Sequence, residues 1–449
     1  MKHVIVYPAL CLIVLVSAAT AATIKVPGDQ PTIQAGIDAA STGDTVLVSE
    51  GIHSGPGNRD LSFNGKSITV KSKKGAEKTV IDCEQLGRGF LFNSGESNAA
   101  VLDGFTIMNG LVDGCGAGIY ISGSSPTVMN NIITGNLATG SFPANGGGIY
   151  CESFSIPVIR DNVISWNVAE WWGGGISFYY NYATVTIEGN AIVDNQFMDG
   201  AVHLWESDVV VDGCTLAYNM AWNLCGGIYC DYMSRADVVD SILWDNMDGL
   251  SPNGMCDLFA AALGYIDIDY SDFSTDRQGP GMGRTGPFNI TNYPMFASAG
   301  SDYRLCRESP CINAGRPTKW DPDGTVKDMG AFYYDLTKTC VGYVSPFSKT
   351  ISRTGGALDV AYAMNNSLTV PHTFYYMTNI FLPGGFAFPG NPFVGPTPVT
   401  LPGGSSTQIY MSHPIPAIAP LGLYEYRCLT GVPPATLYDV DSFGFIVVP

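Results

Sequence analysis

Positive charge is scarce in this chain. Lys and Arg together number 22, against 40 Asp and Glu, so the formal net charge is −18 at pH 7. Between Phe90 and Asp276, the only Lys or Arg residues are Arg160 and Arg235. Phosphates and other polyanions are bound by clustered cations. We therefore expect no nucleic-acid partner, and polyanionic substrates and anionic membranes are disfavoured.

Apolar runs long enough to cross a membrane are also missing. The apolar run 4–16 falls short of the roughly 20 residues that a spanning helix needs. It follows a basic start at Lys2 and precedes small residues at Ala19 and Ala21, the three parts of a secretory signal peptide. We predict a signal peptide over residues 1–21, no membrane span, and an extracellular or cell-surface location.

Glycine, in contrast, is abundant, with 53 residues, and it recurs in a repeat. A Gly-rich string precedes the apolar residues Ile119, Ile149, Ile176, Val202 and Ile228, which are 30, 27, 26 and 26 positions apart. A second series ends in asparagine with a similar irregular period: Asn109, Asn136, Asn167, Asn195, Asn219 and Asn246.

A period near 27 without a helical pattern predicts coils of three short strands, stacked about 4.8 Å apart. The first apolar series and the residues two positions later should point inward, because side chains alternate along a strand. The asparagines are predicted to form a ladder at a tight bend, since Asn tolerates the left-handed conformation and can bond to its stacked equivalents.

The two ends of this region resemble a known family. The opening 24–53, IKVPGDQPTIQAGIDAASTGDTVLVSEGIH, and the later strings at 309–317 and 321–334 are similar to secreted bacterial right-handed parallel β-helix proteins of the pectin-lyase-like superfamily. The resemblance covers residues 24 to about 336. It implies an all-β solenoid whose open end is capped by a short helix at about 32–40.

The expected organisation has three parts after the signal peptide. Residues 22–60 form the N-terminal cap, and 61–337 form the parallel β-helix with its closing segment. Residues 338–449 lose the repeats and gain proline-rich turns between alternating stretches such as HTFYYM and TQIYM. That pattern predicts a small immunoglobulin-like β-sandwich, an accessory domain.

Aromatic and acidic residues are predicted on the outer face of the strands that carry the Gly-rich string. In-line rings with carboxylates among them could stack sugar rings. The alternative is that these side chains pack along the solenoid for stability. The candidate ligand-binding residues are Tyr120, Tyr150, Glu152, Tyr179, His203, Trp205, Tyr229 and Asp231.

Known catalytic arrangements of the superfamily are not matched. A lyase needs a basic residue and usually Ca²⁺, and cations are scarce. Glycoside hydrolysis needs two carboxyls about 5–9.5 Å apart, whereas Glu152 and Asp231 should stand about 14 Å apart, three coils from each other. The adjacent Asp-Asp and the His-Gly of polygalacturonases do not occur. A serine and His203 could suit an esterase, but no nucleophile-turn motif accompanies them.

Cysteines and aspartates suggest structural links. The 12 cysteines fit an oxidising compartment. The candidate disulfides are Cys306 with Cys311, Cys340 with Cys428, and Cys225 with Cys256. Asp321, Asp323 and Asp328 have the oxygen-rich spacing of a structural calcium loop; the alternative is a turn that closes the solenoid. No other cofactor is expected.

The leading hypothesis is a secreted or surface-displayed β-helix protein that binds a polysaccharide or cell-surface glycan on its aromatic outer face without catalysis. One alternative is a carbohydrate-active enzyme, either a polysaccharide lyase or a glycoside hydrolase. The other is a structural stalk or adhesin.

Overall fold

The computed structural model describes residues 21–141, 143–249, 254–261, 263–274 and 279–449. The signal peptide predicted over residues 1–21 lies outside the described residues, apart from Ala21. Within the described ranges, no helix is long and apolar enough to cross a membrane.

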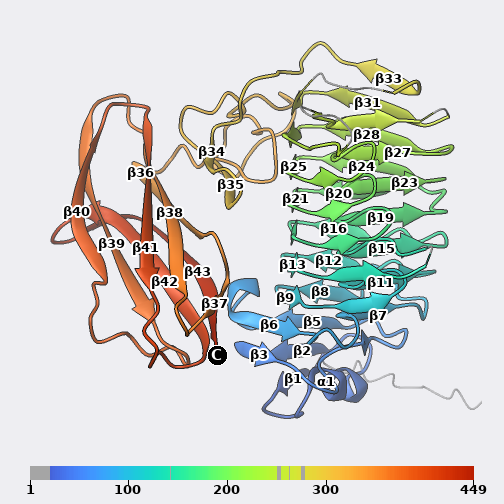
Figure 1. Ribbon diagram of the computed structural model, residues 1–449, viewed down its shortest axis with the longest axis horizontal. Coiled ribbons are helices and arrows are strands. Elements are labelled where there is room, and N and C mark those ends of the chain that lie inside the picture. Colours follow the sequence, from blue (N-terminus) through green and yellow to red (C-terminus); the bar gives the residue numbers. More distant parts are fainter. Residues whose placement is uncertain (1–20, 142, 250–253, 262, 275–278) are drawn as a thin grey trace, which may run out of the picture.

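Two bodies stand side by side in Figure 1. One is a stack of short parallel strands that runs from α1 (Ile33–Ala39) to β33 (Met282–Thr285), and the other is a group of longer strands at the C-terminus. The predicted all-β fold, a parallel β-helix followed by a small domain of sheets, is confirmed.

Each coil of the stack contributes one strand to each of several sheets. The aromatic sheet consists of β4 (Leu61–Ser62), β7 (Phe90–Phe92), β11 (Ile119–Ser122), β15 (Ile149–Glu152), β19 (Ile176–Tyr179), β23 (Val202–Trp205), β27 (Ile228–Cys230) and β30 (Leu258–Ala260). The cleft sheet consists of β3 (Gly51–His53), β6 (Thr79–Asp82), β9 (Thr106–Met108), β13 (Ile132–Thr134), β17 (Val163–Ser165), β21 (Ala191–Val193), β25 (Thr215–Ala217), β29 (Ile242–Trp244) and β32 (Asp272–Phe273).

Two further sheets complete the coils. The long sheet consists of β1 (Thr23–Val26), β2 (Thr45–Val48), β5 (Thr69–Ser72), β8 (Val101–Asp103), β12 (Thr127–Met129), β16 (Val158–Arg160), β20 (Val185–Glu188), β24 (Asp208–Asp212), β28 (Arg235–Val239), β31 (Tyr265–Asp269) and β33. The short sheet consists of β10 (Leu111–Asp113), β14 (Leu137–Thr139), β18 (Val168–Ala169), β22 (Gln196–Phe197) and β26 (Met220–Ala221).

The predicted inward rows form the core of the solenoid. Ile119 pairs with Ile149, and the register continues through Ile176 and Val202 to Ile228. These side chains are buried, as are those two positions later, such as Phe178. Because the strands pair in register, each inward side chain rests on its equivalent in the next coil, and one apolar column runs through the stack.

The glycines of the repeated string allow neighbouring coils to approach closely. A Cβ at Gly148 would lie 2.6 Å from the carbonyl oxygen of Gly175 in the next coil. Gly146, at the start of the same string, has a φ of +65°, a conformation that glycine adopts without steric cost. The glycine repeat therefore reflects backbone packing at the bend that precedes each strand of the aromatic sheet.

An asparagine ladder follows the cleft sheet. Asn136, Asn167, Asn195, Asn219 and Asn246 are each fully buried. In each step, the backbone N–H and the side-chain amide of one Asn donate to the Oδ1 of the next. The remaining amide hydrogens are satisfied by carbonyl groups of the same turn or of the preceding coil. The ladder thus pairs polar groups that the bend would otherwise bury without partners.

Two details of the predicted ladder are wrong. Asn109 is not part of it: Gly110 holds the ladder position and donates to Asn136, while Asn109 bonds to Asp82. The left-handed conformation falls on the residue before each ladder Asn rather than on the Asn itself, with a φ of 57° at Trp166, for example. The role of the Asn side chains is therefore to form hydrogen bonds inside the bend.

The N-terminal end is closed by α1, as the family resemblance implied. Thr32 caps the helix by accepting a hydrogen bond at its side-chain oxygen from the Ala35 N–H. Ile33 and Ile37 are buried on the end of the column. A Cβ at Gly36 would lie 2.9 Å from Val26 and Val46, so glycine permits the helix to sit directly on the first coil.

The C-terminal domain contains two sheets around a shared apolar core. One sheet consists of β36 (Cys340–Pro346), β38 (Ala357–Asn366) and β41 (Ser406–Pro414). The other consists of β37 (Thr350–Ser352), β43 (Thr436–Val448), β42 (Gly422–Val432), β39 (His372–Phe381) and β40 (Val394–Leu401). The immunoglobulin-like identity of this domain stays a prediction.

Ion pairs link the C-terminal domain to the solenoid at the cap-proximal end. Glu425 of β42 accepts from Lys78, and Lys349 donates to Glu77. Glu77 and Lys78 belong to the short helix η1 (Ala76–Lys78). At the other end, the hairpin of β34 (Phe296–Ser298) and β35 (Asp302–Leu305) lies between the two bodies (Figure 1).

The predicted disulfides are not formed. The eleven cysteines of the described residues are thiols. The Cys311 thiol points to Asp272 and the Cys306 thiol to the carbonyl of Phe296, so the expected small loop is not closed. Cys340 and Cys428 are both buried in the C-terminal core, and both are thiols.

The third predicted pair, Cys225 with Cys256, is close but not bridged. The Cys225 thiol donates to the Cys256 carbonyl oxygen at 2.9 Å. Burial, and then the neighbouring Cys256 thiol, hold the pKa of Cys225 well above its usual value. Both residues belong to a small apolar cluster with Tyr229, which suits neutral thiols that fill space.

Candidate functional site

The predicted outer row of the aromatic sheet is more buried than expected. His203, Tyr150 and Tyr229 are 0%, 3% and 7% exposed, whereas Tyr120 and Trp205 are partly exposed. The expectation of an exposed row that includes His203 is therefore wrong. Glu152, Tyr179 and Asp231 are also partly exposed.

Stacking between coils explains this burial. In-register strands place equivalent side chains about 4.8 Å apart, a spacing at which aromatic rings stack with an offset. Tyr120 stacks on Tyr150 with ring centroids 5.7 Å apart, and His203 stacks on Tyr229 at 5.6 Å. The faces of these rings cover one another and are not available to a sugar. For this row, packing along the solenoid is the role that the geometry supports.

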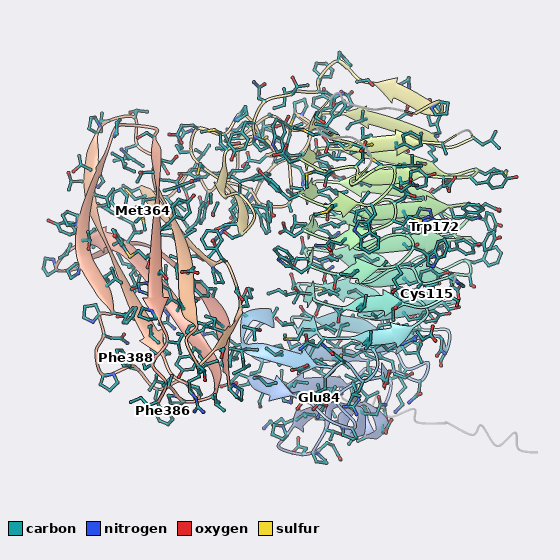
Figure 2. All side chains as sticks on the ribbon, viewed as in Figure 1. Glu84, Cys115, Trp172, Met364, Phe386 and Phe388 are labelled. Carbon is teal, nitrogen blue, oxygen red and sulfur yellow. The ribbon has the colours of Figure 1, made fainter. Side chains whose placement is uncertain are left out.

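Trp172 covers His203. The two rings stack with centroids 4.8 Å apart, and the same indole stacks on Trp205 at 5.8 Å. In the view of Figure 2, Trp172 lies on the part of the solenoid away from the C-terminal sheets. Burial lowers the pKa of His203 to about 3, so the ring is neutral at physiological pH.

His203 and its serine neighbour do not form a nucleophile pair. The Ser177 Oγ lies 3.5 Å from His203 Nδ1, and both side chains are fully buried. The His203 Nε2 has no hydrogen-bond partner within the described residues. No group therefore orients the imidazole as a base, and the covered Ser177 hydroxyl cannot reach a substrate.

The acidic members of the row are held by their neighbours. Glu152 accepts hydrogen bonds from the Tyr120 and Tyr150 hydroxyls. Burial raises the pKa of Asp231, which accepts from the Tyr232 N–H. Two carboxyls at the spacing required for glycoside hydrolysis are not brought together by these residues.

A second group of aromatic residues, not predicted from the sequence, lies just past the strands of the aromatic sheet. We define the aromatic edge as Phe154, Tyr180, Tyr182 and Tyr232, which are 70%, 38%, 53% and 41% exposed. Phe154 contacts Tyr182 with ring centroids 5.3 Å apart, and Tyr180 contacts Tyr182 at 6.2 Å. The Tyr182 hydroxyl donates to Glu206 at 2.7 Å. Tyr179 and Trp205 adjoin the edge through Tyr180 and Tyr232.

The turn conformation is what exposes these rings. Phe154 and Tyr180 have φ values of 62° and 55°, so the chain turns sharply as each strand ends. A side chain at such a turn leaves the alternation of the strand and points away from the stacked row. The only sequence signal was an aromatic residue next to the expected end of each strand.

A cleft of about 610 Å³ lies between the solenoid and the C-terminal domain. The outer surface of the cleft sheet forms its floor, from β6 to β21, and residues of β35, β36 and β43 form the opposite wall. The floor alternates apolar and hydroxyl side chains, such as Ile132 and Thr134 or Val163 and Ser165.

Asp194 is the most perturbed carboxyl of this cleft. It follows β21, and its Oδ2 accepts a hydrogen bond from the Tyr303 hydroxyl at 2.6 Å. Burial raises the pKa of Asp194 to about 7, although the bond from Tyr303 opposes the shift. Other charges at the cleft are paired: Glu77 with Lys349, and Arg304 with both Asp302 and Asp441.

The predicted calcium loop has the geometry of a turn. Asp328 accepts from the Asn313 and Tyr334 N–H groups, and Asp321 accepts from the Asp328 N–H. Asp323 accepts from Thr325 and from the Leu336 N–H. Among the described residues, no three acidic, His or Cys side chains gather closely enough to hold a metal ion. The arrangement favours the turn that closes the solenoid.

Comparison with known proteins identifies the solenoid. Residues 57–216 and 90–257 match a family model described as a right-handed beta helix region. The matched segments lie within the coils described above, so the main body is a right-handed parallel β-helix. No curated protein matches this chain.

Two solved structures show a local likeness. One is β-glucuronidase 2 of Bacteroides uniformis, covalently bound to cyclophellitol-6-carboxylate aziridine, with 15% identity and a TM-score of 0.19. The other is a β-glucuronidase of the same organism, with 15% identity and a TM-score of 0.18. Each match covers 23% of this chain and only 12% of the other chain. A likeness of this extent does not bear on what this chain binds.

Proposed function

We propose that this right-handed parallel β-helix protein binds neutral glycans through its aromatic edge and does not turn them over. The observation that carries the proposal is the run of exposed rings past the aromatic sheet, at Phe154, Tyr180, Tyr182 and Tyr232. The predicted signal peptide implies that the protein is exported, so this binding would take place outside the cell.

Exposed rings of this kind suit sugars for a physical reason. Pyranose rings present apolar C–H faces that pack on aromatic rings, while their hydroxyls need nearby acceptors. Glu206 lies beside Tyr182, and Asp231 precedes Tyr232, so carboxylate acceptors adjoin the rings. The net charge of −18 favours a neutral glycan over an anionic one.

Replacement of Tyr180 and Tyr182 together by alanine should weaken retention on an insoluble neutral polysaccharide about tenfold or more, since each ring contributes about 1 kcal/mol of stacking. Both rings are solvent-exposed, so the thermal midpoint should change little. A pull-down on a panel of neutral and acidic polysaccharides measures the retention. Tyr265→Ala is the matched control, because Tyr265 is 39% exposed on the long sheet.

Equal retention of the double variant and the Tyr265→Ala control would contradict the proposal. The same incubations should be assayed for new reducing ends and for unsaturated uronates. A product would instead support the carbohydrate-active enzyme, and neither retention nor product would support the stalk or adhesin.

A further inference from the structure

One turn of the solenoid faces the cleft in three successive coils. The residue before each ladder asparagine occupies this turn, and its φ is positive in successive coils. The turn residues are Gly135, Trp166, Asp194, Tyr218 and Asp245, with φ values of 64°, 57°, 56°, 55° and 51°, and Asn109 occupies the same turn before Gly110 with a φ of 58°. Their side chains form a column with a spacing of about 4.8 Å, and Gly135, Trp166 and Asp194 line the cleft.

This column has a gap beside a tryptophan. A Cβ at Gly135 would meet only the Asn109 side chain, at 3.9 Å. Trp166, in the next coil, is 53% exposed, and no other described aromatic ring stacks on it. On the aromatic sheet, in contrast, aromatic side chains of successive coils cover each other, as Tyr120 and Tyr150 do. Trp166 therefore keeps a large apolar surface open at the floor of the cleft, on the side where the neighbouring coil lacks a side chain.

Polar groups complete the surroundings of Trp166. Asp194 follows it in the column and is held by Tyr303 from the opposite wall. With its raised pKa, Asp194 keeps a proton through mildly acidic pH and can then both donate and accept a hydrogen bond. The Ser165 hydroxyl, one residue before Trp166, donates to Thr134 at 3.2 Å. These hydroxyl and carboxyl groups match the donors and acceptors of sugar hydroxyls.

The charges of the cleft argue for an uncharged ligand. Among the described residues that line it, Lys349 is paired with Glu77, and Arg304 is shared by Asp302 and Asp441. No lining cation is left to neutralise an anionic ligand, and the carboxyls outnumber the cations. A sulfated or uronic acid ligand would meet a net negative wall.

From this geometry we propose a second, separate carbohydrate site in the cleft, in which one neutral pyranose ring stacks on Trp166 in the space beside Gly135, near the Thr134 and Ser165 hydroxyls. The site lies on the cleft sheet, whereas the aromatic edge lies on the aromatic sheet, so neither site requires the other. A ligand there would touch both the solenoid and the wall that carries Tyr303.

The test uses the full chain and soluble neutral oligosaccharides, namely cello-, xylo-, manno- and malto-oligosaccharides. Binding is measured by isothermal titration and by saturation-transfer NMR. Trp166→Ala should weaken binding of the bound oligosaccharide at least tenfold. Trp222→Ala is the matched control, because Trp222 is 47% exposed and does not line the cleft; its affinity should stay within twofold of the unmodified protein.

A second variant fills the gap instead of removing the ring. Gly135→Tyr should also weaken binding at least tenfold. Tyr218 and Trp166 hold aromatic side chains at the same turn with the same positive φ, so the substitution is compatible with the fold. Circular dichroism and the thermal midpoint check that Trp166→Ala and Gly135→Tyr are folded.

The outcomes separate this site from the aromatic edge. In the background of the Tyr180→Ala and Tyr182→Ala double variant, which removes the edge site, Trp166→Ala should still weaken the remaining binding at least tenfold, so the cleft site is measured separately. The proposal is overturned if no oligosaccharide of the panel binds, or if binding is the same in Trp166→Ala and in Trp222→Ala. Full affinity in Gly135→Tyr would overturn the placement of the ring beside Gly135.

Discussion

Replacement of Asn167 by alanine is expected to destabilise the protein by about 3–5 kcal/mol. Asn167 is fully buried in the middle of the ladder, where its Oδ1 accepts from the Asn136 N–H and side-chain amide. Its own amide donates to the Ile133 carbonyl and to Asn195. Alanine would leave the Asn136 N–H buried without a partner and remove the side-chain bonds to the Asn136 amide and the Ile133 carbonyl, and an unsatisfied buried group costs about 1–3 kcal/mol.

Chemical denaturation followed by circular dichroism measures this effect. The matched control is Asn109→Gly. Asn109 belongs to the same asparagine series in the sequence but stands outside the ladder. Its amide bonds to Asp82, and its φ of 58° is one that glycine adopts without strain. The control should cost less than about 1 kcal/mol. Equal losses in the two variants would mean that the ladder adds nothing beyond a surface turn.

The protein is expected to be more stable at pH 5 than at pH 8. Burial raises the pKa of Asp194, Asp272 and Asp328 to about 7 and that of Asp257 to about 6. Below about pH 4 these carboxyls are protonated in both the folded and the unfolded chain. Between pH 4 and pH 7 the unfolded chain releases its protons first, so stability falls as pH rises, and above about pH 7 the loss is complete.

Asp194→Asn isolates one of these groups. An amide can still accept from Tyr303 but does not ionise, so the variant should match the unmodified protein near pH 4 and exceed its stability at pH 8 by about 3–4 kcal/mol. The groups that face Asp194 are Tyr303 of β35 and Tyr218 of the next coil. Urea unfolding at pH 4, 6 and 8 provides the comparison.

A control of opposite sign is available at the surface. Backbone N–H groups of Ala22 and Ser41 lower the pKa of Asp44, which is partly exposed. Asp44→Asn should therefore give no gain in stability at pH 8. A gain in Asp44→Asn equal to that in Asp194→Asn would point to the overall negative charge as the cause, instead of the burial of Asp194.

The solenoid was predictable because its signals are local and repeated. The inward row from Ile119 to Ile228 lies where the sequence pattern placed it, and the helix that begins at Ile33 lies where the family resemblance placed it. The ladder was also recognised, but Asn109 was included in error because Gly110 fills its place in that coil. A pattern read along the chain cannot tell which of two adjacent residues turns into the bend.

The candidate sites were much less predictable. His203 was expected on the surface because it alternates with inward residues, yet Trp172, which precedes it by more than one coil, covers it. The exposed edge at Phe154 and Tyr180 depends on positive φ values that the sequence does not mark in aromatic residues. Cys306 and Cys311 are neighbours in the chain, but their thiols point to different partners.

By itself, the sequence determined the period and the direction of the core residues, because both depend on residue types that recur at short range, and the capping helix followed from the family resemblance. Only the tertiary structure decided which polar and aromatic residues face solvent and which face the cleft. Asp194 and Tyr303 are 109 positions apart and meet only because the chain returns from the end of the solenoid along its side. Asp194 is buried, and its pKa raised, only because the returning chain packs against it, and no local pattern encodes that contact.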